Sequence, residues 1–166
     1  MARRYTTAQF TALVAAARAA IPDLAVTSDV IVGFPGETEA HFAESLSFVQ
    51  ALDLAQVHVF PYSLRAGTPA AQMPAQVPPQ VKAERAQAMR AVAASSEQAF
   101  RQQFIGRTME VLWESSQPQD GSPVWSGLTG NYLRVHTHSA TDLANTITPT
   151  RLVALTRGGL KGVIGT

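Results

Sequence analysis

Cysteine is absent from the 166 residues of this chain. Disulfide bonds, cysteine nucleophiles, and zinc or iron–sulfur sites held by thiolates of this chain are therefore excluded. No apolar run approaches the roughly 20 residues that span a bilayer. The first residues, Met1 to Tyr5, lack the apolar stretch of a secretory signal. We therefore expect a cytoplasmic protein that makes no membrane contact.

Charge of either sign is also scarce. Charged residues make up 15% of the chain, and 13 Lys and Arg against 12 Asp and Glu leave a formal net charge of +1. The total charge neither indicates nor excludes a nucleic-acid partner, because phosphate contacts depend on local basic residues. Hydrophobic residues, at 46%, supply enough side chains for a core. That composition argues against intrinsic disorder.

The first half of the chain alternates predicted helices and strands. A helix capped by Thr6 or Thr7 is expected to run to about Ile21, and another is expected to begin at Thr38. Residues 25–32 and 55–62 are short, β-branched and apolar, so each predicts a strand, the first one buried on both faces. Strand, helix and strand in succession indicate a parallel crossover unit, and therefore an α/β fold.

The second half begins with an irregular stretch over residues 63–79 and a long helix predicted over residues 80–104. The basic residues of that helix are expected to be solvated: Lys82, Arg85, Arg90 and Arg101. Short β-like pieces at residues 108–114, 126–129, 132–136, 145–155 and 162–164 then predict a small antiparallel barrel. The boundary near Ile105 gives two predicted domains, residues 1–104 and 105–166.

The turn from Gly33 to Glu37 joins the first predicted strand to a helix start. Strand ends and helix amino termini present N–H groups to ligands, the glycines of the turn permit close backbone approach, and Glu37 could bind a hydroxyl or an amine. A plain strand-to-helix turn, with Glu37 favouring the helix dipole, explains the same residues. The Lys-Ser/Thr ending of a phosphate loop is missing, which argues against a nucleotide triphosphatase.

His58, Phe60 and Tyr62 alternate along the second predicted strand and therefore share one face. That face is either a wall for the aromatic ring of a ligand or barrel core. Arg65, in the following loop, is either an anion or RNA contact or a plain surface residue. Four residues of the expected barrel suit RNA through stacking and phosphate contacts: Tyr132, Arg134, Arg157 and Lys161.

No metal site and no catalytic residue are predicted. His136 and His138 lie two residues apart on a predicted strand, but a third ligand of the right type is missing. No serine–histidine–acid arrangement and no pair of carboxylates stands out. The residues alone therefore indicate an α/β unit joined to a small barrel, without an assigned reaction.

Two segments closely resemble the radical S-adenosylmethionine tRNA methylthiotransferases: Asp29–Thr38 (DVIVGFPGET) and His58–Ala71 (HVFPYSLRAGTPAA). The resemblance continues through residues 81–85, 104–108, 130–135 and 159–162, and so covers nearly the whole chain. It implies the C-terminal part of a radical-SAM (β/α) partial barrel over residues 1–104. It also implies an OB-like RNA-binding TRAM barrel over residues 105–166.

The same resemblance implies roles for individual residues. Ile31, Gly33, Gly36 and Glu37 would lie beside the adenine of S-adenosylmethionine, and Phe60 and Tyr62 would line the same cofactor. The candidate tRNA contacts are Arg65, Tyr132, Arg134, Arg157 and Lys161. The family also binds two [4Fe-4S] clusters, each through three cysteines, and their ligands are absent from this chain. We therefore expect an inactive C-terminal fragment that lacks the amino-terminal half of the enzyme and can self-associate through an open sheet edge.

The family resemblance implies a specific reaction for the intact parent. His58-Val-Phe-Pro-Tyr62 is most similar to the branch that adds a methylthio group to C2 of N6-threonylcarbamoyladenosine, next to the anticodon of tRNA. In that chemistry, cleavage of S-adenosylmethionine yields a radical that abstracts the ring hydrogen. Two other functions stay open: a non-catalytic RNA-binding module, and an unrelated α/β enzyme with an anion site at Gly33–Glu37.

Overall fold

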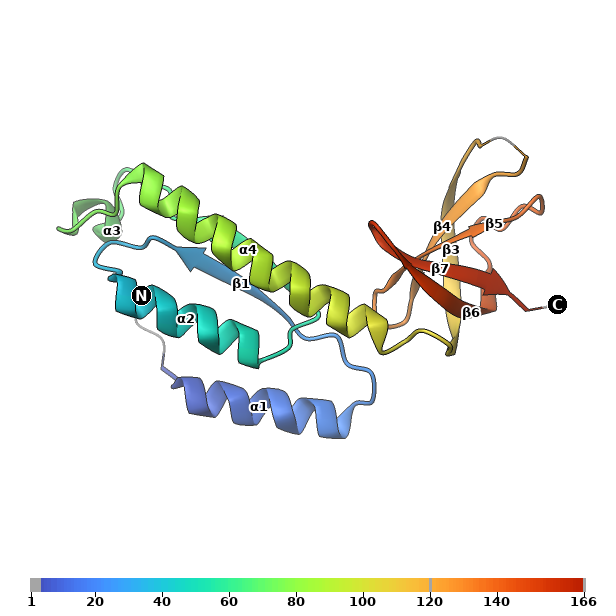
Figure 1. The fold of residues 1–166 in the computed structure, drawn as a ribbon, viewed down its shortest axis with the longest axis horizontal. Helices are drawn as coiled ribbons and strands as arrows, with labels where there is room; N and C mark the ends of the chain where they lie inside the picture. Colours follow the sequence, from blue (N-terminus) through green and yellow to red (C-terminus); the bar gives the residue numbers. More distant parts are fainter. Residues whose placement is uncertain (1–3, 120, 166) are drawn as a thin grey trace. The chain divides into compact units, whose positions relative to one another are not determined.

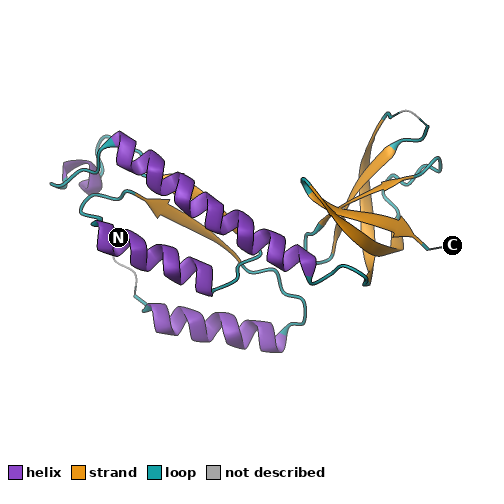
Figure 2. Ribbon diagram, viewed as in Figure 1, coloured by secondary structure: helices purple, strands orange, loops and turns teal. Residues whose placement is uncertain are grey.

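A computed structural model describes residues 4–119 and 121–165 and divides the chain into an α/β unit and a closed β-barrel unit (Figures 1 and 2). The predicted combination of an α/β unit with a small β-barrel is confirmed. The two units separate between Ala99 and Phe100. The predicted boundary near Ile105 falls shortly after that point, where the ring of Phe104 lies 5.1 Å from that of Phe100.

Threonine caps open the first two helices, α1 (Thr7–Ala20) and α2 (Glu39–Ala51). The hydroxyl of Thr6 accepts from the N–H of Gln9, and that of Thr38 accepts from the N–H of His41, each at 3.2 Å. Gln9 and His41 return a contact to the cap N–H, which completes a capping box in both helices. Both helix starts are thus set locally, and the predicted caps are confirmed.

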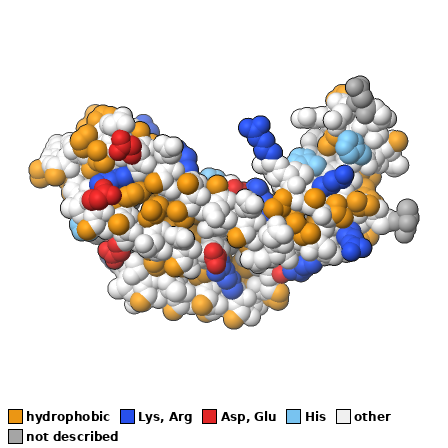
Figure 3. Space-filling view, viewed as in Figure 1, with side chains coloured by type: hydrophobic (Ala, Val, Ile, Leu, Met, Phe, Trp, Pro, Cys, Tyr) orange, Lys and Arg blue, Asp and Glu red, His pale blue; other side chains and the backbone are white. Residues whose placement is uncertain are grey.

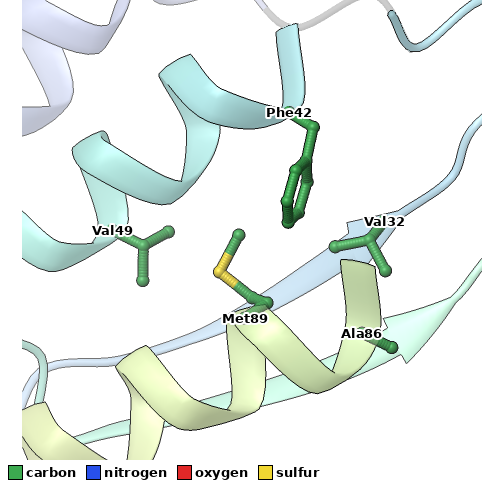
Figure 4. Packing of buried hydrophobic residues seen from close by; sticks show 5 residues of the cluster. All are labelled: Val32, Phe42, Val49, Ala86 and Met89. Atoms are coloured by element: carbon green, nitrogen blue, oxygen red, sulfur yellow. The ribbon is translucent and has the colours of Figure 1, made fainter. Parts of the chain in front are cut away.

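The strands β1 (Thr27–Val32) and β2 (Gln56–Pro61) pair in parallel on either side of α2 in the sequence, as predicted. One face of this sheet packs against α2 and α4 (Pro79–Gln102). The core there joins a strand to both helices through Val32, Phe42, Val49, Ala86 and Met89 (Figure 4). Burial of the valine, phenylalanine and methionine side chains contributes about 1.5–3 kcal/mol each, which fixes the face that the strands turn inward.

The prediction that the first strand is buried on both faces is wrong. Burial alternates along β1 and β2, and Ile31 and Phe60 on the other face are 40% and 51% exposed. α2 and α4 pack on the valine-rich face, and the apolar side chains of Ile31 and Phe60 on the opposite face meet solvent. Within the described residues, β1 and β2 pair with no further strand, and self-association through an open edge stays a prediction.

The stretch predicted to be irregular contains a short helix, α3 (Pro69–Gln72). Thr68 caps it, and Pro69 occupies the first turn, where its missing N–H costs nothing. The long helix α4 lies close to its predicted range. No helix in residues 4–119 or 121–165 has the length and apolarity to cross a membrane.

The second unit is a closed barrel with the strand order β3-β4-β5-β7-β6. Its strands are β3 (Thr108–Gln117), β4 (Val124–Thr129), β5 (Arg134–His138), β6 (Ile147–Thr156) and β7 (Gly159–Ile164). The barrel was predicted to be antiparallel, but β5 and β7 pair in parallel. Fully buried Val111, Trp113, Val135, Leu152 and Leu160 fill its interior.

Four barrel strands, β4 to β7, begin two or three residues from the predicted positions, and two of these shifts have a clear physical reason. The strand expected from Tyr132 begins at Arg134, because Tyr132 has a φ of 65° and its N–H donates to the Thr129 carbonyl at 2.9 Å, which closes a turn. The last strand begins at Gly159 rather than Gly162. A Cβ at Gly159 would collide with the carbonyl oxygen of Arg134, so glycine permits the close β5–β7 approach.

Candidate functional site

A pocket of about 640 Å³ opens beside the carboxyl ends of β1 and β2. It brings together four residues that the sequence marks as site candidates: Ile31, Phe60, Tyr62 and Arg65. Phe34 and Met73 add further apolar wall, and the segment that carries α3 closes one side. A concave, mostly apolar surface with a few polar groups is typical of a site for a small organic ligand.

Strand register explains why these side chains meet. Ile31 lies directly opposite Phe60, and both project from the face opposite the one that packs on α2 and α4. Tyr62 follows β2, and its N–H extends the ladder by donating to the Val32 carbonyl at 2.8 Å. The rings of Tyr62 and Phe34 meet edge to face at 5.4 Å. The buried Tyr62 hydroxyl finds no hydrogen-bond partner among the described residues, so a ligand could satisfy it.

Three N–H groups of the Gly33–Glu37 turn are already hydrogen-bonded to acceptors of this chain. Gly33 N–H donates to Glu37 Oε1 at 3.0 Å, Gly36 N–H to the Ala75 carbonyl at 2.9 Å, and Glu37 N–H to the Phe34 carbonyl at 2.9 Å. An anion would have to displace these contacts in the presence of the Glu37 carboxylate. The geometry therefore argues against an anion site here, and Gly33, Gly36 and Glu37 do not line the pocket.

Two basic residues of α4 were missed as site residues. Arg85 was predicted to be solvated but is 7% exposed, and its guanidinium pairs with the Glu37 carboxylate at 2.8 Å. Lys82 was also predicted to be solvated, but it is half-buried and its Nζ donates to the Tyr62 carbonyl at 3.1 Å. A signal was present, since Arg85 stands four residues before Met89 and hence on the apolar seam of the helix. Arg90 is exposed, as predicted.

The candidate RNA contacts of the barrel gather at one end. β5 and β7 run parallel with Val135 opposite Leu160, so the turns that precede them lie at the same end. Those turns carry Tyr132, which is 81% exposed, and Arg157. Arg134 and Lys161 stand near the starts of the two strands. Basic and histidine side chains stand among hydrophobic ones on the barrel surface in Figure 3.

Local electrostatics limit the charge at this end. Arg134 donates to the Glu114 carboxylate at 2.7 Å, with both side chains about two-fifths exposed, which makes a weak surface pair. Burial lowers the pKa of His136, and the neighbouring Arg134 charge lowers it further. His136 is therefore neutral near pH 7, and Arg134, Arg157 and Lys161 provide the positive charge of this end.

No protein-family model matches the chain. The threonylcarbamoyladenosine tRNA methylthiotransferase MtaB of Bacillus subtilis (strain 168) is 36% identical to it over 154 residues, which are 92% of this chain and 34% of that protein. The tRNA-2-methylthio-N(6)-dimethylallyladenosine synthase of Erythrobacter litoralis is 45% identical over 127 residues, 76% of this chain and 28% of that protein. The protein of the same name from Desulfitobacterium hafniense is 41% identical over 123 residues, which are 74% of this chain and 27% of that protein. The chain spans about a third or less of the length of these relatives.

Proposed function

The chain belongs to the tRNA methylthiotransferase family, and we propose that it forms the part of such an enzyme that walls one side of an S-adenosylmethionine site and docks tRNA. The observation that carries the proposal is the pocket at the ends of β1 and β2. Its residues fit an adenosyl group, because Ile31 and Phe60 offer apolar surface to a flat ring and the unpaired Tyr62 hydroxyl suits a polar edge. When bound, S-adenosylmethionine would supply the adenosyl and methyl groups that the reaction uses.

Iron–sulfur clusters do not fit the residues of this chain. Cluster iron is held mainly by cysteine thiolates, and the sequence contains no cysteine. In the proposal, the cluster ligands belong to regions of the relatives outside the matched segment, since that segment covers about a third of their length or less. This chain by itself would therefore bind and position without turnover, in the cytoplasm, where tRNA is modified.

The proposed nucleoside substrate is N6-threonylcarbamoyladenosine next to the anticodon, with a methylthio group replacing the hydrogen at C2. The Bacillus subtilis relative, which matches over 92% of this chain, is named for that nucleoside. A second candidate is the N6-dimethylallyladenosine branch, whose two named relatives have higher identity over a shorter part of the chain. Both branches would use the same pocket and the same barrel.

The tRNA-docking role of the barrel rests on the gathering of Tyr132, Arg134, Arg157 and Lys161 at one end. An exposed ring can stack on an unpaired base of a loop, while guanidinium and ammonium groups contact phosphates. A non-catalytic RNA-binding module would present the same residues. Methylthio product formation therefore distinguishes the two functions, and RNA affinity alone does not.

A chimera tests this function. The matched segment of the B. subtilis relative is replaced by this chain, and tRNA nucleosides are analysed by mass spectrometry from cells that lack their own methylthiotransferases. We expect the methylthio derivative of N6-threonylcarbamoyladenosine, at a lower level when Phe60→Ala enlarges the pocket and at an unchanged level with Arg90→Ala on the exposed side of α4. The dimethylallyl product instead would favour the second branch. A folded, tRNA-binding chimera that makes neither product would support the non-catalytic module.

A further inference from the structure

Two side chains of α4 reach the carboxyl ends of both strands, and we propose that Lys82 and Arg85 are positioning residues of the candidate pocket. They lie one helical turn apart and so project from the same side of α4. Arg85 contacts the turn after β1, and Lys82 contacts the end of β2. Neither residue lines the pocket, so both act through the backbone that carries its walls. Only the identity of the ligand rests on the proposed function.

Arg85 fixes the turn after β1 through Glu37. Its Nη1 donates to Glu37 Oε1 at 2.8 Å and to the Glu37 carbonyl at 3.0 Å. The same Oε1 accepts from the N–H of Gly33 at 3.0 Å, so one carboxylate oxygen links the helix to the first residue of the turn. The two side chains are 8% and 13% exposed. Water competes little for such a pair, which makes its geometry specific.

The planar guanidinium also reaches the start of α2. Its Nη2 lies 3.1 Å from Oε2 of Glu39, and its centre lies 5.4 Å from the centroid of the Phe42 ring. The Glu39 side chain is 81% exposed, so this second contact adds little to stability but orients the guanidinium group. Arg85→Lys would keep the positive charge but lose the planar guanidinium, and so could not hold the Glu37 and Glu39 carboxylates in the same way.

Lys82 joins the two strand ends. Its Nζ donates to the Tyr62 carbonyl at 3.1 Å and lies 5.7 Å from the centroid of the Tyr62 ring. Its aliphatic stem packs on Gly33, where a Cβ would collide with Lys82 Cγ. The stem therefore rests on the β1 end while the charged group rests on the β2 end. Because Tyr62 lines the pocket, a shift of Lys82 moves a pocket wall.

Amide NMR spectra of the full chain test the positioning directly. Arg85→Met and Arg85→Lys should both shift the amide resonances of Gly33 and Glu37, and Lys82→Met should shift that of Ser63, which follows the Tyr62 carbonyl. Val92→Ala is the control for lost stability, because Val92 lies on the same helix two turns beyond Arg85 and packs against the core, and neither hydrogen bond of the proposal involves it. Arg90→Met removes an exposed charge of α4. Unmoved Gly33 and Ser63 resonances in the Arg85 and Lys82 variants, or equal shifts in Val92→Ala, would overturn the proposal.

A titration with S-adenosylhomocysteine, at a temperature where every variant is folded, adds the functional readout. We expect Arg85→Lys and Lys82→Met to weaken binding at least threefold and Val92→Ala to leave it unchanged. Equal affinity in all of these chains would overturn the positioning role. Absence of binding to the unaltered chain would count against the proposed function instead, and the amide resonances would then decide the positioning role alone.

Discussion

Arg85 and Glu37 stand 48 positions apart in the sequence, and their charged groups meet at 2.8 Å. The Glu37 carboxylate simultaneously accepts from the Gly33 N–H, so the pair joins a helix to the turn that follows β1. A plain strand-to-helix turn would leave Glu37 at the surface near the helix start. The buried pair instead makes the turn depend on a distant helix, and its removal has measurable consequences.

Arg85→Met should destabilise the α/β unit by about 3 kcal/mol, because it leaves the Glu37 carboxylate buried without its partner. Both tryptophans of the chain, Trp113 and Trp125, lie in the barrel, so their fluorescence reports that unit alone. In urea unfolding of Arg85→Met, the midpoint urea concentration followed by far-UV circular dichroism of the helices should fall. The midpoint followed by tryptophan fluorescence should change little. Arg90→Met should stay within about 0.5 kcal/mol of the unaltered chain. An Arg85→Met midpoint equal to that of Arg90→Met would contradict the structural role of the pair.

Gly33→Ala should cost more stability than Gly36→Ala. Both glycines have positive φ, of 72° and 83°, so both substitutions carry backbone strain of about 1 kcal/mol. Only at Gly33 does the new Cβ also collide with the stem of Lys82, while the space beside Gly36 is open. Lys82→Ala should therefore recover part of the loss in the double variant. A double-mutant cycle with no coupling between positions 33 and 82 would show that the collision does not matter.

Acid should destabilise the barrel through His136. Because burial and Arg134 lower its pKa in the folded chain, the unfolded chain takes up this proton first as the pH falls below the ordinary value of 6.5. The contribution of neutral His136 to the free energy of unfolding is complete above pH 6.5 and is lost as the pH falls toward the lowered pKa of the folded chain. Below that pKa it changes no further. Unfolding followed by tryptophan fluorescence at pH 7.5 and at pH 5 should show a smaller loss in His136→Asn than in the unaltered chain. Equal losses in the two chains would contradict this assignment.

Substitutions at the barrel end should separate stacking from charge in tRNA binding. Tyr132→Ala should weaken binding by about 1–3 kcal/mol without altering the salt dependence. Lys161→Ala should reduce the slope of log affinity against log salt by about 0.7–0.9, the value for one lost phosphate contact. Arg151→Ala is the matched control, because this exposed arginine pairs with Val163 near the opposite end of β7. An equal loss of affinity in Arg151→Ala would show that total charge, rather than this end of the barrel, determines binding.

Local sequence signals predicted much of the fold. Thr6 and Thr38 cap their helices because the side chain that completes each cap lies only three residues away. Thr68 followed by Pro69 is the same kind of signal, and it accounts for the short helix α3 that was missed. The start of β7 could not be read from its own residues. It lies at Gly159 because the backbone there approaches Arg134 of β5 closely.

The parts that could not be predicted depend on contacts distant in the sequence. An apolar strand such as β1 has the same sequence pattern whether helices cover one face or two, so the exposure of Ile31 follows only from what packs against it. Arg85 was expected at the surface because basic residues on a long helix are usually solvated. Its position four residues before Met89 signals burial, but no local pattern connects it to Glu37, so its partner could not be predicted. Phe60 and Tyr62 were candidates from their alternation along the strand as well as from the resemblance, Ile31 from the resemblance alone, and the strand register brings the three together.

The most direct test of the proposed cofactor wall is the δ1 methyl resonance of Ile31 during titration of the chain with S-adenosylhomocysteine. We predict a saturable shift at Ile31, weaker binding in Tyr62→Phe because the hydroxyl is lost, and no shift at Ile147 in the barrel. An Ile31 resonance that stays in place at millimolar ligand, or one that moves no more than Ile147, would contradict the assignment of this pocket.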